Sequence, residues 1–174
     1  IGTALLPRLS KNIKAGRLED ALSNQEKSLE IGLMLTVPAA LGLMVLSDPI
    51  ITLLFQRGLF DIESTNLTSL ALLAYSTGLP AFVLIKILQP NFFARNDTIT
   101  PVKIAAIAVL TNLILNLILM QYFAHVGLAL ATSVSAWLSA ILLLIILKKK
   151  EFYRLRKLLL VKILQISLAA CVMA

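Results

Sequence analysis

The stretch LTSLALLAYSTGLPAFVLIKIL, residues 67–88, decides the fold of this chain. It carries a single charged residue, Lys86, and it is long enough to cross a bilayer, which takes about 20 helical residues. A lysine within such a helix is costly unless it faces a protein interior, a wet cavity or a charged ligand. Lys86 is therefore the first candidate for a functional residue.

The whole chain has the composition of a membrane protein. Of its 174 residues, 59% are hydrophobic and 14% are charged, which is more apolar surface than a soluble domain of this size can bury. The net charge is +7, but the charges lie between the apolar runs. Membrane lipids with anionic head groups are therefore the expected neighbours, and nucleic acid is not. The single Cys171 excludes a disulfide framework.

The apolar runs predict five membrane-spanning helices, and the fold class is therefore all-α, a polytopic transmembrane helix bundle. The polar residues 8–30 form an amphipathic segment that we expect at the membrane surface. A strongly basic loop covers residues 148–157. The predicted spans are residues 31–47, 67–93, 102–122, 126–147 and, as the start of a further span, 158–174.

Proline residues predict bends within these spans. Pro38 lies inside the first span, and Pro80 and Pro90 lie inside the second together with Gly78. Because proline removes one helical hydrogen bond and clashes with the preceding turn, we expect kinks at these positions.

Other residues predict where helices start and where the chain turns. Asp48 is a good cap before a short interfacial helix over residues 49–55. Thr100 is expected to cap the third span in the same way, before a proline at its first turn. A tight turn is predicted around His125 and Gly127.

The distribution of Lys and Arg predicts the orientation. The connecting segments on one side hold five (residues 8–30), two (Arg95 and Lys103) and six (148–157), whereas those on the other side hold only Arg57. Thirteen against one favours a cytoplasmic location for the basic side. Lys86 then lies nine residues before Arg95, or roughly 13 Å inside that boundary at ~1.5 Å per residue.

Two interpretations of Lys86 follow from its position. It can be a cationic contact for an anionic substrate such as a diphosphate, since lysine binds phosphate as a point charge. It can also extend to the cytoplasmic head groups, which its depth permits. The residues alone leave both interpretations open.

The remaining polar residues favour structural roles. Asn112 and Asn116 share one face of the third span, where interhelical hydrogen bonding is the usual purpose of amides. The small residues between Gly127 and Ser139 predict close helix packing. His125 has no partner at metal-ligand spacing, so no metal site is expected. No nucleophile motif, phosphate-binding glycine loop or catalytic carboxylate pair occurs, so neither enzymatic activity nor a cofactor is predicted.

Several motifs resemble the MurJ (MviN) family of bacterial lipid II flippases. The similarity covers residues 1–147. The matching stretches are GTALLPRLS (2–10), LFQRGLF (54–60), YSTGLP (75–80), KILQP (86–90), FARNDT (93–98), TPVK (100–103) and GLAL (127–130).

The resemblance implies a MATE-like fold of the MOP superfamily, with about fourteen transmembrane helices in two six-helix lobes around a central cavity and two further helices. Residues 1–147 would belong to the C-terminal lobe, as the end of one helix and four complete ones. The family moves undecaprenyl-diphosphate-linked peptidoglycan precursor, lipid II, to the outer leaflet of the bacterial inner membrane by alternating access. Lys86 matches a lysine that faces the cavity, and it is the predicted substrate-binding residue.

The chain starts with Ile1 rather than Met and ends within an apolar run. We therefore expect a piece of a longer polytopic protein, with the rest of that parent chain as its partner and with most of the family's substrate-binding arginines before Ile1. Two alternatives remain open from the sequence. One is another exporter of the same superfamily, for lipid-linked polysaccharide or drugs, and the other is a membrane scaffold that does not transport.

Overall fold

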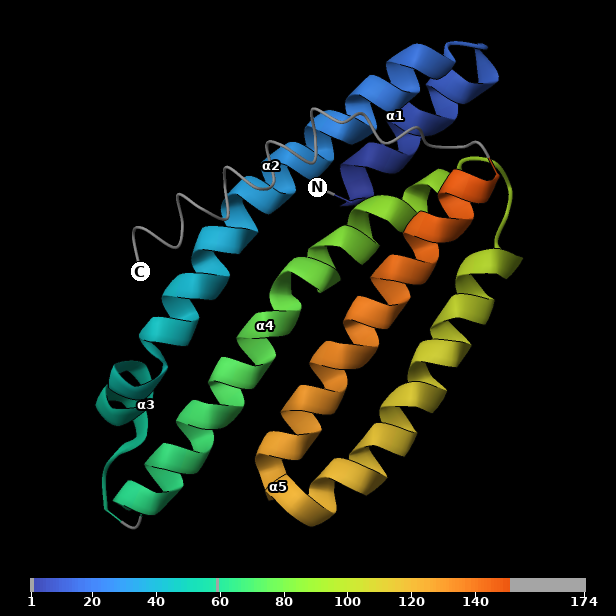
Figure 1. Ribbon diagram of the computed structural model, residues 1–174. Coiled ribbons are helices and arrows are strands. Elements are labelled where there is room, and N and C mark those ends of the chain that lie inside the picture. Colours follow the sequence, from blue (N-terminus) through green and yellow to red (C-terminus); the bar gives the residue numbers. More distant parts are fainter. Residues whose placement is uncertain (1, 59, 151–174) are drawn as a thin grey trace.

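The structure is a computed structural model that describes residues 2–58 and 60–150, and every regular element in these ranges is a helix (Figure 1). The all-α prediction is confirmed. The predicted span from residue 158 and the basic loop beyond residue 150 lie outside the described residues. The helices are α1 (Gly2–Lys14), α2 (Leu18–Val45), α3 (Ser47–Phe55), α4 (Ile62–Phe93) and α5 (Ile99–Lys149).

Four helical segments in the described part are long and apolar enough to cross a membrane. They are Glu19–Val45, Ile62–Phe93, Ile99–Phe123 and His125–Lys149. The last two are the halves of α5, which reverses direction between them (Figure 1). The protein is therefore a multi-pass membrane protein, and each of the four predicted spans within residues 31–147 coincides with one of these helices, with shifted boundaries.

The reversal of α5 depends on a close backbone approach at Gly127. A Cβ atom at this position would lie 2.5 Å from the carbonyl oxygen of Leu119, which is closer than non-bonded atoms can approach. The prediction of a tight turn around His125 and Gly127 is confirmed in this sense, although the backbone keeps helical hydrogen bonding through the turn.

The second half of α5 packs against α4 through small side chains. Ser133 Oγ donates a hydrogen bond to the carbonyl oxygen of Ala74 at 2.7 Å, and the indole N–H of Trp137 donates to the carbonyl oxygen of Thr77 at 2.9 Å. Because small residues let the two backbones approach closely, side-chain groups reach the main chain of the neighbouring helix. The small-residue packing predicted for this span is confirmed. The buried members are Ala129, Ala131, Ser133, Ser135, Ala136, Ser139 and Ala140.

The amphipathic segment 8–30 differs from the prediction. Residues 2–14 form α1, the chain turns at residues 15–17, and α2 then continues without a break from Leu18 into the apolar span. The apolar stripe of α2, which includes Ala21, Leu29 and Leu33, is buried, and α2 packs against both α1 and α4. The segment is amphipathic as predicted. Its apolar face, however, packs against other helices of the protein, and the segment does not form a separate helix on the membrane surface.

Two predicted capping residues were assigned to the wrong positions. Leu46 precedes α3 and Asp48 lies in its first turn, with no side-chain hydrogen bond to the helix N-terminus. At α5 the side chain that accepts is Asp97, which bonds the N–H of Thr100 at 3.1 Å and its hydroxyl at 2.8 Å. Since each helix starts a residue or two before the predicted position, the expected caps fall inside the first turn.

The prolines do not interrupt the helices. Pro38 lies inside α2, and Pro80 and Pro90 lie inside α4, and both helices are continuous. α4 curves along its length toward its C-terminal end (Figure 1). Of a bend and a local break, which the prolines and Gly78 both allow in the second span, the structure has the bend. Neighbouring helices and serine or threonine hydroxyls can satisfy the carbonyl groups that a proline releases.

An ion pair joins the α4–α5 loop to the end of α5. Lys150 Nζ contacts Asp97 Oδ2 and Thr100 Oγ1. This lysine and the Thr100 N–H lower the pKa of Asp97 from 3.8 to about 2.

This pKa shift predicts a pH-dependent contribution to stability. Because the pKa of the folded state is depressed, the contribution is present above pH 3.8 and is lost as the pH falls toward about 2. The pair is partly exposed, so Asp97→Asn should destabilise the protein by less than ~1 kcal/mol at neutral pH. Thermal unfolding in detergent at pH 7 and at pH 2 measures this. If Asp97→Asn lowers the unfolding temperature by the same amount at pH 7 and at pH 2, the depressed pKa of Asp97 does not contribute to stability.

Candidate functional site

Lys86 lies on an exposed face of α4. The two neighbours one turn away on this face are Phe82, which is exposed, and Gln89, which is half-buried. No described residue forms a hydrogen bond or an ion pair with the Lys86 side chain. A charge at this depth therefore needs water, lipid head groups or a group from outside residues 2–58 and 60–150 to solvate it.

A groove with both apolar and polar side chains adjoins this face. Phe82 and Gln89 line it together with residues from both halves of α5, and its volume is about 320 Å³. Asn112, Thr132 and Ser135 contribute amide and hydroxyl groups from the α5 side. Lys86 thus lies one turn from a groove that combines hydrogen-bonding groups with apolar side chains.

The amides of Asn112 and Asn116 connect the two halves of α5. Asn112 Nδ2 donates to Ser135 Oγ at 3.2 Å and lies 3.4 Å from Thr132 Oγ1. Asn116 Nδ2 donates to Asn112 Oδ1 at 3.0 Å. The predicted interhelical hydrogen bonding of Asn112 is confirmed, while Asn116 acts through Asn112. These bonds fix the wall of the groove.

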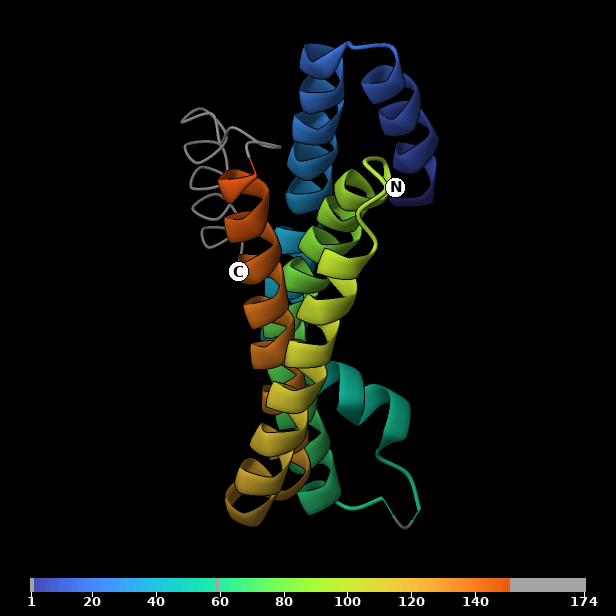
Figure 2. The same cartoon turned by 90° about the vertical axis from the view of Figure 1, so that its right-hand side faces the viewer.

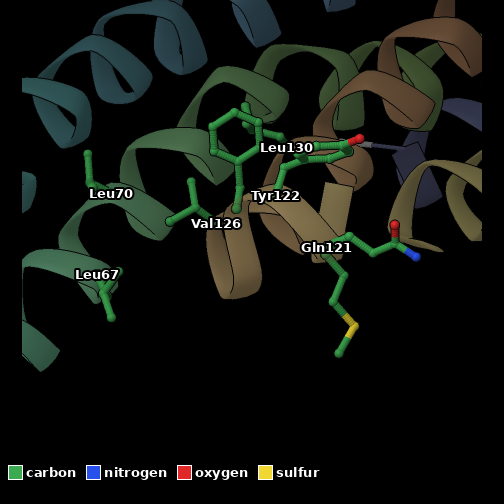
Figure 3. A pocket seen from close by; sticks show the side chains of 8 residues that line it. Leu67, Leu70, Gln121, Tyr122, Val126 and Leu130 are labelled. Atoms are coloured by element: carbon green, nitrogen blue, oxygen red, sulfur yellow. The ribbon is translucent and has the colours of Figure 1, made fainter. Parts of the chain in front are cut away.

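A second, larger groove lies at the reversal of α5. Its volume is about 600 Å³, and no acidic or basic side chain lines it. Figure 3 shows Leu67 and Leu70 of α4 on one side, with Val126 and Leu130 of α5 on the other, while Gln121 points away from α4. This mainly apolar lining fits hydrocarbon and offers no cation that would hold a diphosphate.

A buried polar contact joins α2 to α4 near the basic end of the bundle. Asn91 Nδ2 donates to Gln25 Oε1, and both side chains are almost completely buried. Asn91 Oδ1 lies 3.4 Å from Nε of Arg95, whose pKa is lowered by burial. The contact joins α2 to α4 and brings the Asn91 amide to the guanidinium of Arg95.

Two further polar residues, Asp48 and His125, do not line the groove beside Lys86. Asp48 lies on α3, and His125 lies at the reversal of α5. Among the described residues, no group of three or more His, Cys, Asp and Glu side chains could hold a metal ion.

Sequence reasoning singled out Lys86 as the candidate but did not predict the groove beside it. Gln89 was visible as a polar residue three positions after Lys86, which places both on one helix face. The contribution of Thr132 and Ser135 depends on the reversal of α5, which brings them opposite α4.

These features point to a class of protein. Four helices of membrane-spanning length among the described residues, with a lysine inside one of them, are what a membrane protein that handles a charged or polar group would contain. A family model described as "Lipid II flippase MurJ" matches residues 1–174, and the chain belongs to this family. A flippase is a transporter rather than an enzyme, so the prediction of a protein without enzymatic activity is confirmed.

Individual relatives and a solved structure support the same family assignment. The probable lipid II flippase MurJ of Rhizobium meliloti (strain 1021) is 43% identical over 174 residues, 100% of this chain and 32% of the relative. That of Rhizobium tropici is 44% identical over 150 residues, 86% of this chain and 28% of the relative. A structure of "Lipid II flippase MurJ, inward closed conformation" matches with a TM-score of 0.83 at 29% identity, and the match covers 99% of this chain and 35% of that one.

The matches cover nearly all of this chain but only part of each relative. The chain spans about a third of the length of the curated relatives that it matches. The match to the solved structure extends the confirmed fold class from an all-α bundle to the fold of this transporter family.

Proposed function

We propose that the protein containing this chain is a lipid II flippase of the bacterial inner membrane. It would move the undecaprenyl-diphosphate-linked peptidoglycan precursor from the cytoplasmic to the outer leaflet by alternating access. The family match supports this function. Lipid II would be its substrate, and the rest of the full-length chain would complete the substrate site.

The described residues would form part of the C-terminal lobe, with the basic ends of the helices on the cytoplasmic side. The loop at residues 94–98 and the end of α5 lie at one end of the bundle, whereas α3 and the reversal of α5 lie toward the other (Figure 1). The excess of Lys and Arg at the first end favours this orientation.

Lys86 is the residue of this chain that we propose contacts the substrate. The observation that carries the proposal is its exposed side chain within a span, with no partner among the described residues. Facing the central cavity, its ammonium group would attract the diphosphate. At a separation of about 10 Å and an effective dielectric constant of ~20, this attraction amounts to roughly 1–2 kcal/mol.

Substitution of Lys86 in the full-length protein tests this role. We expect Lys86→Ala to lower the rate of lipid II flipping in proteoliposomes about ten-fold, because ~1.4 kcal/mol corresponds to a factor of ten. Lys86→Arg should retain most of the activity, since it keeps the positive charge. Lys148→Ala, which removes an exposed lysine at the end of α5, is the matched control and should have little effect.

Three results would contradict the proposal, and each would point to a different error. Undiminished flipping and growth with Lys86→Ala would show that the lysine only reaches the head groups. Loss of flipping in Lys86→Ala and Lys148→Ala alike would point to a general effect of net charge. If the unaltered full-length protein moves a drug or a polysaccharide-linked lipid but not lipid II, the proposed substrate is wrong.

A further inference from the structure

The short helix α3 and the turn after it have no role in the proposed transport site. They include the stretch LFQRGLF, residues 54–60, which is one of the motifs that resemble the family. The structure describes all of it except residue 59. Its position, its exposed side chains and its one basic residue together indicate what it contacts.

Chain connectivity holds α3 at the boundary of the membrane. A single residue, Leu46, separates it from the membrane-spanning part of α2, and residues 56–61 connect it to the membrane-spanning α4. Figure 2 shows α3 to the side of the spanning helices, toward the end where α5 reverses. A nine-residue helix on such short connections cannot move away from the bilayer surface.

Burial changes along the length of α3. Ser47 and Ile51 are buried, and α3 packs chiefly against α4. At its C-terminal end, Leu53 is 76% exposed, Leu54 55% and Phe55 53%. Three consecutive large apolar side chains at a membrane boundary are the composition that enters the acyl region of a leaflet.

The turn after α3 places an aromatic pair and a cation beside these residues. Gly58 has a φ of +60°, and the N–H of Phe60 donates to the carbonyl oxygen of Arg57 at 3.1 Å. The chain thereby returns so that the rings of Phe55 and Phe60 lie 6.1 Å apart. Arg57 stays exposed, with its guanidinium 3.4 Å from the carbonyl oxygen of Leu53.

We propose that α3 and Arg57 form a phospholipid-binding surface at the end of the bundle opposite the basic segments. Leu53, Leu54 and Phe55 enter the acyl-chain region, and the Arg57 guanidinium binds the phosphate of a lipid head group. Arginine suits this contact because its planar group donates two parallel hydrogen bonds to phosphate. Arg57 is the only Lys or Arg between Lys27 and Lys86, so it is the cation placed to meet lipid phosphate at this boundary.

Site-directed spin labelling of the full-length protein tests the surface. The cysteines, including Cys171, are replaced, and a nitroxide is attached at position 54 or, as a control, at the exposed residue Glu63 in the first turn of α4. The protein is reconstituted in vesicles of phosphatidylethanolamine and phosphatidylglycerol. Collision rates with oxygen and with a water-soluble nickel chelate are then measured.

We expect the ratio of oxygen to nickel collisions at position 54 to exceed that at position 63 several-fold. Equal ratios would place α3 in water and overturn the proposal. Low collision rates with both reagents at position 54 would show that another part of the protein covers the helix, which also overturns it.

The role of Arg57 is tested in the same system. Arg57→Gln should lower the oxygen-to-nickel ratio at position 54, since the helix loses its anchor to the phosphate, while Arg57→Lys should largely restore it. An unchanged ratio in Arg57→Gln would show that the apolar residues suffice and that Arg57 binds no phosphate. Because the readout is depth and not flipping, the result is independent of the proposed transport function.

Discussion

Replacement of Gly78 by alanine is expected to destabilise the protein by about 1–3 kcal/mol, the usual cost of overpacking a tight contact. A Cβ atom on Gly78 would lie 2.7 Å from Oγ of Ser133 and 3.0 Å from its Cα. The Ser133 side chain cannot simply rotate away without losing its hydrogen bond to Ala74. The two helices must therefore separate, which also weakens the bond from Trp137 to the backbone of α4. Thermal unfolding of the full-length protein in detergent measures the loss.

Gly42→Ala is the matched control for this substitution. Gly42 also lies within a membrane-spanning helix, but a Cβ atom there meets nothing within 4 Å in the described part of the chain. Alanine is favoured over glycine in a helix by ~1 kcal/mol, so this variant should be as stable as the parent or more so. Equal stability of the Gly78 and Gly42 variants would mean that the approach of α4 and α5 is looser than the contact distances indicate.

Replacement of Asn91 by leucine is expected to cost about 2–3 kcal/mol, although leucine has a similar volume. Asn91 supplies the hydrogen bond to Oε1 of Gln25, whose side chain is completely buried and whose Nε2 has no hydrogen-bond partner in the described part of the chain. Without Asn91, the whole Gln25 amide would be buried with no hydrogen bond among the described residues. An unsatisfied buried polar group costs ~1–3 kcal/mol.

The double variant Gln25→Met/Asn91→Leu separates this explanation from a simple packing defect. Methionine fills a space like that of glutamine but has no amide, so the buried polar groups disappear from both helices. We expect the double variant to be more stable than Asn91→Leu alone, which is a coupling that a double-mutant cycle detects. If the two substitutions add independently, the hydrogen bond does not stabilise the contact of α2 with α4.

Much of the fold could be predicted from the sequence because spanning helices depend mainly on local properties. The length and polarity of each apolar run identify a helix that satisfies its own backbone groups within the bilayer. The family was also recognisable, since motifs such as KILQP and YSTGLP are contiguous in the chain. Lys86 was predicted as the candidate site residue because a charge in an apolar run is evident without any knowledge of its neighbours.

The errors arose where contacts between distant residues decide the outcome. The segment 8–30 was assigned to the membrane surface because its amphipathic pattern does not say which apolar surface covers it. In the structure α2 packs against α1 and α4 there. The capping residues were misplaced for a related reason: helix boundaries depend on a few hydrogen bonds, such as those of Asp97, that competing polar side chains can also form.

The sequence by itself determined that the chain is a set of membrane-spanning helices, that one of them carries a lysine, and which family it belongs to. These properties are encoded in runs of neighbouring residues. Only the tertiary structure decided that Lys86 lies beside a groove with hydroxyl and amide groups in its lining, because Thr132 and Ser135 come opposite α4 only after α5 reverses. It also decided that Gly78 meets Ser133, since the distance between two packed helices depends on side chains far apart in the sequence.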